Sequence, residues 1–260
     1  GINILLNMFF GPFVNAARGI AVQVQGAVTQ FSTNFQTALN PQITKSYALG
    51  DFTYMHSLIF RSSKFTFLLL AVISFPILLE TEMILQLWLN MVPAYTVVFV
   101  RLMLCITIID AMGGAFMVAA QSTGRVRFYQ SVVGGILLAI VPVSYVVLRL
   151  GAAPWSVFLI HFCVCTVAFF VRLFIIRSMI HLSLYSYFHA VLLRCLYVLL
   201  LAMPLPIGLL YIFPATLWAG ISVCFVSVLT ISLSSYRVGL AEGERKFIKE
   251  KIRMFLGKSN

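Results

Sequence analysis

The stretch from Cys195 to Tyr236 contains no charged residue over 42 positions. One membrane crossing takes about 20 apolar residues, so this stretch is too long for a single crossing. Pro204, Pro206 and Pro214 lie near its middle, where a turn between two crossings is expected. We therefore predict two transmembrane helices here.

The composition extends this prediction to the whole chain. Apolar residues make up 61% of the 260 residues, charged residues only 10%, and the mean hydropathy is +1.01. Soluble domains contain about half apolar and about a quarter charged residues. We predict an all-α, polytopic membrane helix bundle with about seven complete spans and one truncated span.

Eight apolar segments can be traced along the chain. The first ends near Phe10, before Gly11-Pro12, and is about half a crossing long. This favours a chain that begins inside a helix and is a fragment of a longer protein. The second segment is polar and is expected to end at Pro41. Residues 80–95, with Trp88, are expected to form an interfacial loop or short helix. The other six segments are 58–79, 96–120, 131–147, 155–176, 189–212 and 216–235.

Basic residues are concentrated on alternate connections, which are 41–64, 121–130, 172–194 and the tail 237–260. Arg101 and Arg149 fall on the opposite side, and Arg18 lies within a segment. By the positive-inside rule, the basic connections and the C-terminus are cytoplasmic. The net charge of +11 then reports topology and contact with anionic lipids, not nucleic-acid binding. Fifteen of the 18 basic residues follow this pattern: Lys45, Arg61, Lys64, Arg125, Arg127, Arg172, Arg177, Arg194, Arg237, Arg245, Lys246, Lys249, Lys251, Arg253 and Lys258.

The tail, residues 237–260, also carries apolar residues at helical spacing. This pattern favours an interfacial amphipathic helix, and the alternative is a disordered basic tail. The apolar positions are Leu240, Phe247, Ile248, Ile252, Phe255 and Leu256.

The polar segment, from about Phe13 to Asn40, has one apolar arc and one polar arc on a helical projection. Unsatisfied amides in hydrocarbon cost several kcal/mol each, so the polar arc must face protein or water. Two interpretations stay open: hydrogen bonds between packed helices, and the wall of a water-filled cavity for a polar cargo. A helix lying flat on the membrane fits poorly, because the polar arc lacks lysines. The candidate cavity residues are Asn15, Arg18, Gln23, Gln30 and Asn34.

Arg18 and Asp110 are charged residues within predicted spans, and each has a structural and a functional interpretation. Arg18 lies about one turn inside its helix and either reaches the surface or binds an anionic group such as a phosphate. Asp110 lies in the middle of a span, where an acid indicates proton or cation coupling, or a structural pair with Arg18 or an Asn.

Two glycine pairs and one histidine within the predicted spans are expected to have structural roles. Gly113-Gly114 and Gly134-Gly135 are expected at close helix contacts, and His161 is expected as a hydrogen-bonded core residue.

No motif for bond-making or bond-breaking chemistry is found. The sequence has no GxxxxGK[ST], HExxH or GxSxG, so we expect no ATP site, no catalytic residues, no metal and no cofactor. The five cysteines are odd in number and fall within predicted spans, which favours buried thiols over disulfides. Many helices, one polar intramembrane face and no energy-transducing motif are typical of a secondary transporter, not an enzyme.

Four runs carry a family resemblance. They are FFGPFVNAARGIAVQVQGAVTQFSTNFQTALNPQITKSYALGD, FRSSK, PILLETEMILQLWL and AAQSTGRVRFYQSVVGG. The chain resembles the second half of bacterial polysaccharide or O-antigen repeat-unit flippases of the multidrug/oligosaccharidyl-lipid/polysaccharide exporter superfamily. The resemblance is strongest over residues 9–64 and 119–135 and weak after about residue 180.

The resemblance implies a MATE-like, two-bundle transporter. Residues 1–176 would form the second six-helix bundle, with a truncated first helix, residues 177–236 two additional helices, and 237–260 the cytoplasmic tail. The implied protein lies in the bacterial inner membrane and flips an undecaprenyl-pyrophosphate-linked oligosaccharide for surface polysaccharide assembly. Arg18 is the implied cationic residue of the cavity. Implied partners are the lipid-linked oligosaccharide, anionic membrane lipids, and a polysaccharide polymerase or other assembly proteins.

Two alternatives stay open at this point. A multidrug exporter of the same superfamily would be expected to have a more aromatic and acidic cavity. A membrane-embedded glycan-modifying enzyme would need reactive residues grouped in a large outer loop, where only Glu80 and Glu82 are prominent.

Overall fold

The structure is a computed structural model that describes residues 1–89, 91–213 and 216–246. All regular secondary structure in these residues is helical, which confirms the predicted all-α class. The elements are α1 (Ile2–Ala48), α2 (Phe52–Leu79), α3 (Thr81–Trp88), α4 (Thr96–Met112), α5 (Gly114–Ser122), α6 (Val126–Leu138), α7 (Ile140–Arg149), α8 (Ser156–Ile180), α9 (Leu184–Tyr187), the π-helical turn η1 (Phe188–Leu192), α10 (Leu193–Ala202), α11 (Pro204–Ile212), α12 (Leu217–Ser234) and the π-helical turn η2 (Ser235–Gly239).

In this part of the chain, seven helical stretches are long and apolar enough to cross a membrane. The prediction of a multi-pass membrane protein is therefore confirmed. The predicted interfacial segment after residue 80 forms the short helix α3. The stretches are 2–48, 52–79, 96–122, 126–149, 156–180, 184–212 and 217–239.

The first two predicted segments form α1, which is sharply kinked at Gly11. Gly11 has φ 77° and ψ −174°, a conformation open to glycine, and Pro12 follows it. Residues 2–10 turn back along α7, where the rings of Phe9 and Tyr145 meet with centroids 5.9 Å apart. The predicted end of the half helix at Gly11-Pro12 is confirmed.

The predicted helix end at Pro41 is wrong. α1 continues through Pro41 to Ala48. Proline removes one backbone hydrogen bond, but tertiary packing overrides local propensity here. Ile43 and Ser46, on the far side of Pro41, are 0% and 3% exposed, so the last turns of α1 are held in the core.

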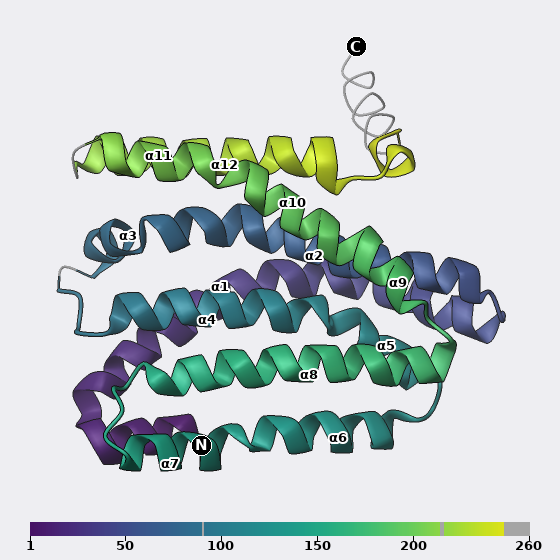
Figure 1. Ribbon diagram of the computed structural model, residues 1–260, viewed down its shortest axis with the longest axis horizontal. Coiled ribbons are helices and arrows are strands. Elements are labelled where there is room, and N and C mark those ends of the chain that lie inside the picture. Colours follow the sequence, from purple (N-terminus) through teal and green to yellow (C-terminus); the bar gives the residue numbers. More distant parts are fainter. Residues whose placement is uncertain (90, 214–215, 247–260) are drawn as a thin grey trace.

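The connections fall at two opposite ends of the bundle (Figure 1). One end, here called the basic end, carries the α1–α2, α5–α6 and α8–α9 connections and residues 237–246. The other, here called the tryptophan end, carries α3, the α7–α8 connection and the start of α12, with Trp88, Trp155 and Trp218. The alternation on which the charge argument rests is thus present, and the cytoplasmic position of the basic end stays a prediction.

All three basic residues expected on the 172–194 connection lie within helices instead. Arg172 is inside α8, two turns before its end at Ile180, Arg177 is in the last turn of α8, and Arg194 is in α10. Helix α8 runs four residues past the predicted boundary of 176, because buried Ile180 extends the apolar pattern. This places the guanidinium of Arg172 inside the bundle.

A buried ion pair joins Glu244, which follows α12 and η2, to Lys64 of α2. Lys64 Nζ lies 2.5 Å from Glu244 Oε2, and the two side chains are 4% and 9% exposed. Glu244 Oε2 also accepts the backbone N–H of Ala241 at 2.7 Å, and Arg61 Nε lies 3.8 Å from Glu244 Oε1. Of the tail predicted as an amphipathic helix, residues 242–246 are helical and residues 247–260 lie outside the described residues.

Candidate functional site

The long part of α1 presents its polar arc away from the rest of the described bundle. Its packed side carries Ala17, Ala21, Val28 and Ser32, all buried against the neighbouring helices α2, α4, α5 and α7. The apolar arc is partly exposed, with Phe13 at 78%, as expected for a surface that meets lipid.

The five predicted cavity residues differ in their exposure along α1. Gln23, Gln30 and Asn34 are exposed, whereas Asn15 and Arg18 are half-buried. Gln30 Nε2 donates to Asn34 Oδ1 at 3.0 Å, one turn along the helix. The predicted alternative of hydrogen bonds to packed helices is not seen for these five side chains within residues 1–89, 91–213 and 216–246.

Asn15 and Arg18 carry unsatisfied polar atoms near the tryptophan end of α1. Asn15 Oδ1 and Arg18 Nε are each buried and lack a hydrogen-bond partner among the described residues. A buried donor without a partner costs about 1–3 kcal/mol. Because both atoms are covered by the protein, a ligand would reach them only after these side chains change conformation.

One α1 side chain outside the predicted set turns into the bundle. Gln36 Nε2 donates to the backbone carbonyl of Ala111 at 2.7 Å and to Thr66 Oγ1 at 3.3 Å. Gly114 makes room for it, since an added Cβ there would collide with the Gln36 amide. The glycine pair at 113–114 was the only sequence signal for this contact.

The carbonyl reached by Gln36 lies where the 96–122 stretch is broken between α4 and α5 at Gly113. A second carbonyl at the break, that of Met112, accepts a hydrogen bond from Ser63 Oγ of α2 at 2.8 Å. A broken helix is tolerated in a membrane where side chains satisfy the freed groups. Here α1 and α2 perform that role.

Asp110 lies next to this break and forms an ion pair with Arg172 of α8. Arg172 Nη1 donates to Asp110 Oδ1 at 2.7 Å. The side chain of Arg172 is 13% exposed and that of Asp110 is 55% exposed. The structural pair expected for Asp110 is therefore present, but its partner is Arg172 instead of Arg18 or an Asn.

The ion pair borders a cavity of about 300 Å³ between α4, α5, α6 and α8. Arg172 Nε is buried without a hydrogen-bond partner among the described residues. The cavity wall includes Tyr129, Gln130 and Gly134 of α6. An arginine fixed by one carboxylate and still holding a free N–H can respond to a second anion, and Asp110 can respond to a cation.

The glycine and histidine expectations need correction. An added Cβ would meet Arg172 at Gly113 and Gln36 at Gly114, so this pair accommodates side chains instead of a neighbouring helix backbone. Among the described residues, nothing lies within 4 Å of an added Cβ at Gly134 or Gly135, so these residues form no close helix contact there. His161 Nδ1 is buried, and the expected hydrogen bond is absent for this atom within the described part of the chain.

The different exposures of Asp110 and Arg172 predict unequal effects on stability. Asp110→Asn is expected to lower the free energy of unfolding by about 1–2 kcal/mol, because it leaves the buried Arg172 without a counter-charge. Arg172→Met should cost less than half as much, since Asp110 reaches solvent. Thermal unfolding in detergent would measure both, with the exposed Glu242→Gln as a control. The reverse order would contradict this account of the pair.

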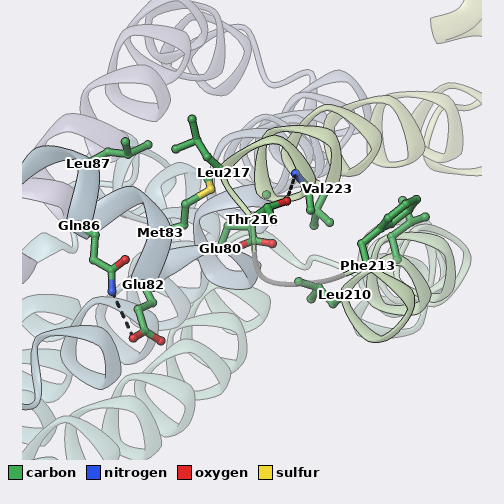
Figure 2. Close-up of a pocket in the computed structure, with 13 residues that line it drawn as sticks. Glu80, Glu82, Met83, Gln86, Leu87, Leu210, Phe213, Thr216, Leu217 and Val223 are labelled. Carbon is green, nitrogen blue, oxygen red and sulfur yellow. Dashed lines mark hydrogen bonds between the residues drawn. The ribbon is translucent and has the colours of Figure 1, made fainter.

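A second pocket, of about 560 Å³, lies at the tryptophan end between α3 and α11–α12 (Figure 2). Glu80, Glu82, Met83 and Gln86 line one side. None of the predicted cavity residues lines it, so it is separate from the polar face of α1.

Comparisons with protein-family models, curated proteins and solved structures found no match to this chain. The functional argument therefore rests on the residues of the chain and on their geometry. All five cysteines are free thiols, and no group of three or more metal-binding side chains occurs in the described residues.

Proposed function

We propose that this chain is part of a secondary transporter that flips an undecaprenyl-pyrophosphate-linked oligosaccharide across the bacterial inner membrane. The observation that carries the proposal is the polar arc of α1, where the exposed amides and the half-buried Arg18 form no hydrogen bond to another helix of the described residues. Such groups are stable in a membrane only against protein or water. A water-filled cavity shared with a second bundle, as in the resembled family, meets this requirement.

The arrangement along α1 suits a cargo with an anionic group and a glycan. Arg18 would bind the pyrophosphate, because a guanidinium recognises phosphate oxygens with charge-assisted hydrogen bonds. Asn15, one turn away, would bind the same group or the first sugar. Gln23, Gln30 and Asn34 continue the arc and would hydrogen-bond sugar hydroxyls, since amides both donate and accept.

Asp110 is the proposed ion-coupling residue of the transporter. Its half-exposed carboxylate borders a cavity and is neutralised by Arg172 at 2.7 Å. A proton or Na⁺ that binds Asp110 would compete with Arg172, and this competition could link ion binding to the break between α4 and α5. Transport would then be ion-coupled through one carboxylate.

The multidrug exporter is less well supported. A cavity for cationic drugs needs unpaired acids and aromatic walls, whereas the α1 arc presents amides and one arginine. Bond chemistry is also less well supported, since the predicted site residues form no nucleophile–base pair.

Deletion of the gene in its bacterial host tests the proposed function. Lipid-linked oligosaccharide is expected to build up on the cytoplasmic leaflet, because its polar glycan cannot cross hydrocarbon unaided. Leaflet-resolved labelling of the glycan, together with drug susceptibility, would measure this. Increased drug susceptibility with normal surface polysaccharide would instead identify a drug exporter.

A further inference from the structure

The pocket at the tryptophan end has two chemically different walls. Glu80 and Glu82 lie on the α2–α3 side, and Figure 2 shows Leu210 of α11 and Phe213, the residue after α11, on the other side. At about 560 Å³ it is in the size range of small-molecule sites. An amphipathic ligand, with a polar group on one side and an apolar part on the other, matches these walls.

A glycine in α12 allows the two walls of the pocket to lie close together. Gly220 lacks a side chain where an added Cβ would collide with Met83 Sδ and would lie 3.4 Å from Glu80 Oε2. α3 and the Glu80 carboxylate can therefore approach α12 closely. Thr216 Oγ1 accepts the N–H of Ala219 at 3.3 Å and so begins α12 at the pocket rim.

The charge of the pocket is negative and uncompensated by nearby side chains. No lysine or arginine is among its lining residues. The three ion pairs found in the described residues do not include Glu80 or Glu82. The nearest arginine on α4, Arg101, instead donates to Thr81 Oγ1 at 3.2 Å and to the Leu79 carbonyl at 3.5 Å. Glu82 accepts a hydrogen bond from the Gln86 amide at 3.4 Å and from no other side chain in the described part of the protein.

The depth of the pocket is that of the membrane interface. Trp88 ends α3 and Trp218 is the second residue of α12, and both are exposed, at 52% and 77%. Exposed tryptophans gather at the level of lipid head groups. The pocket is therefore expected at the level of the head groups.

We propose that this pocket binds a zwitterionic phospholipid through its primary ammonium group, which Glu80 holds while an acyl chain lies against Leu210 and Phe213, and Glu82 adds negative charge at the rim. Charge complementarity selects this occupant, because carboxylates attract an ammonium group and repel anionic head groups. The same carboxylates repel a pyrophosphate, so the pocket is not a second site for the proposed cargo. An inorganic cation alone would leave the apolar wall unused.

The proposal is independent of the proposed function. A lipid bound in this pocket would contact α3 on one side and the α11–α12 pair on the other. Such a lipid would stabilise the packing of the last two spans against the bundle, whichever cargo the protein carries.

Native mass spectrometry of the full chain in detergent, titrated with phosphatidylethanolamine or phosphatidylglycerol, tests the proposal. Phosphatidylethanolamine is expected to bind more tightly, and Glu80→Gln/Glu82→Gln should weaken it by about tenfold through loss of charge-assisted bonds. Binding of phosphatidylglycerol should not weaken. Glu242→Gln, which changes an exposed glutamate at the other end of the molecule, is the matched control.

A second variant separates lipid binding from folding. Phe213→Ala keeps both carboxylates and removes part of the apolar wall at a half-exposed position, and about a fivefold loss of phosphatidylethanolamine affinity is expected. Equal affinity for the two lipids, or an unchanged affinity in Glu80→Gln/Glu82→Gln, overturns the proposal. Binding of Mg²⁺ that depends on the two glutamates, with no lipid preference, would identify a cation site in its place.

Discussion

Replacing Arg18 with alanine is expected to lower the rate of oligosaccharide flipping by about 10- to 100-fold. A hydrogen bond to a charged group contributes about 1.5–3 kcal/mol, and the cargo would lose its cationic contact. Arg18 forms no hydrogen bond or ion pair with the described residues, so the substitution removes no polar contact among them. The deletion strain, complemented with Arg18→Ala and assayed by leaflet-resolved glycan labelling, would measure the effect.

Two controls make the result specific. Arg18→Lys keeps the charge but not the planar guanidinium and should retain part of the activity. Arg127→Ala removes an exposed arginine at the basic end and should leave flipping unchanged. Normal flipping with Arg18→Ala would remove Arg18 from the proposed mechanism, whereas Asn15 and the other amides would need their own tests.

Breaking the ion pair between α2 and residue 244 is expected to have the largest effect on stability. Lys64→Met leaves the carboxylate of Glu244, 9% exposed, without its 2.5 Å partner. Removing one partner of a buried pair costs about 3–5 kcal/mol, because the other charge stays desolvated. Thermal unfolding in detergent should show a clearly lower midpoint.

The double variant Lys64→Met/Glu244→Gln provides the control for this result. It removes both charges and keeps an oxygen that can accept the N–H of Ala241, so it should recover at least half of the lost stability. A double variant as unstable as Lys64→Met would show that packing of Lys64, and not its charge, stabilises α2.

The spans could be predicted from the sequence because each is encoded locally. Apolar length, the Gly11-Pro12 pair and alternating basic connections are properties of neighbouring residues, and they located the seven crossings although several boundaries were wrong by five to eight residues. Pro41 and the end of α8 were misjudged because tertiary contacts extend those helices beyond their local signals.

The contacts inside the bundle could not be predicted in the same way. Glu244 lies 180 positions from Lys64, and Arg172 lies 62 positions from Asp110. Nothing in the local pattern marks one basic residue among many as the partner of a given acid. The polar arc of α1 was predictable because helical periodicity alone places Gln23, Gln30 and Asn34 together.

The break between α4 and α5 has a consequence for how this sequence can change over time. The carbonyls of Ala111 and Met112 are satisfied by Gln36 and Ser63, which come from two other helices, and Gly114 leaves the space for Gln36. A larger residue at 114 would displace Gln36 and leave the Ala111 carbonyl without its partner. Positions 36 and 114 should therefore covary among homologous sequences, with a small residue at 114 wherever a long amide stands at 36.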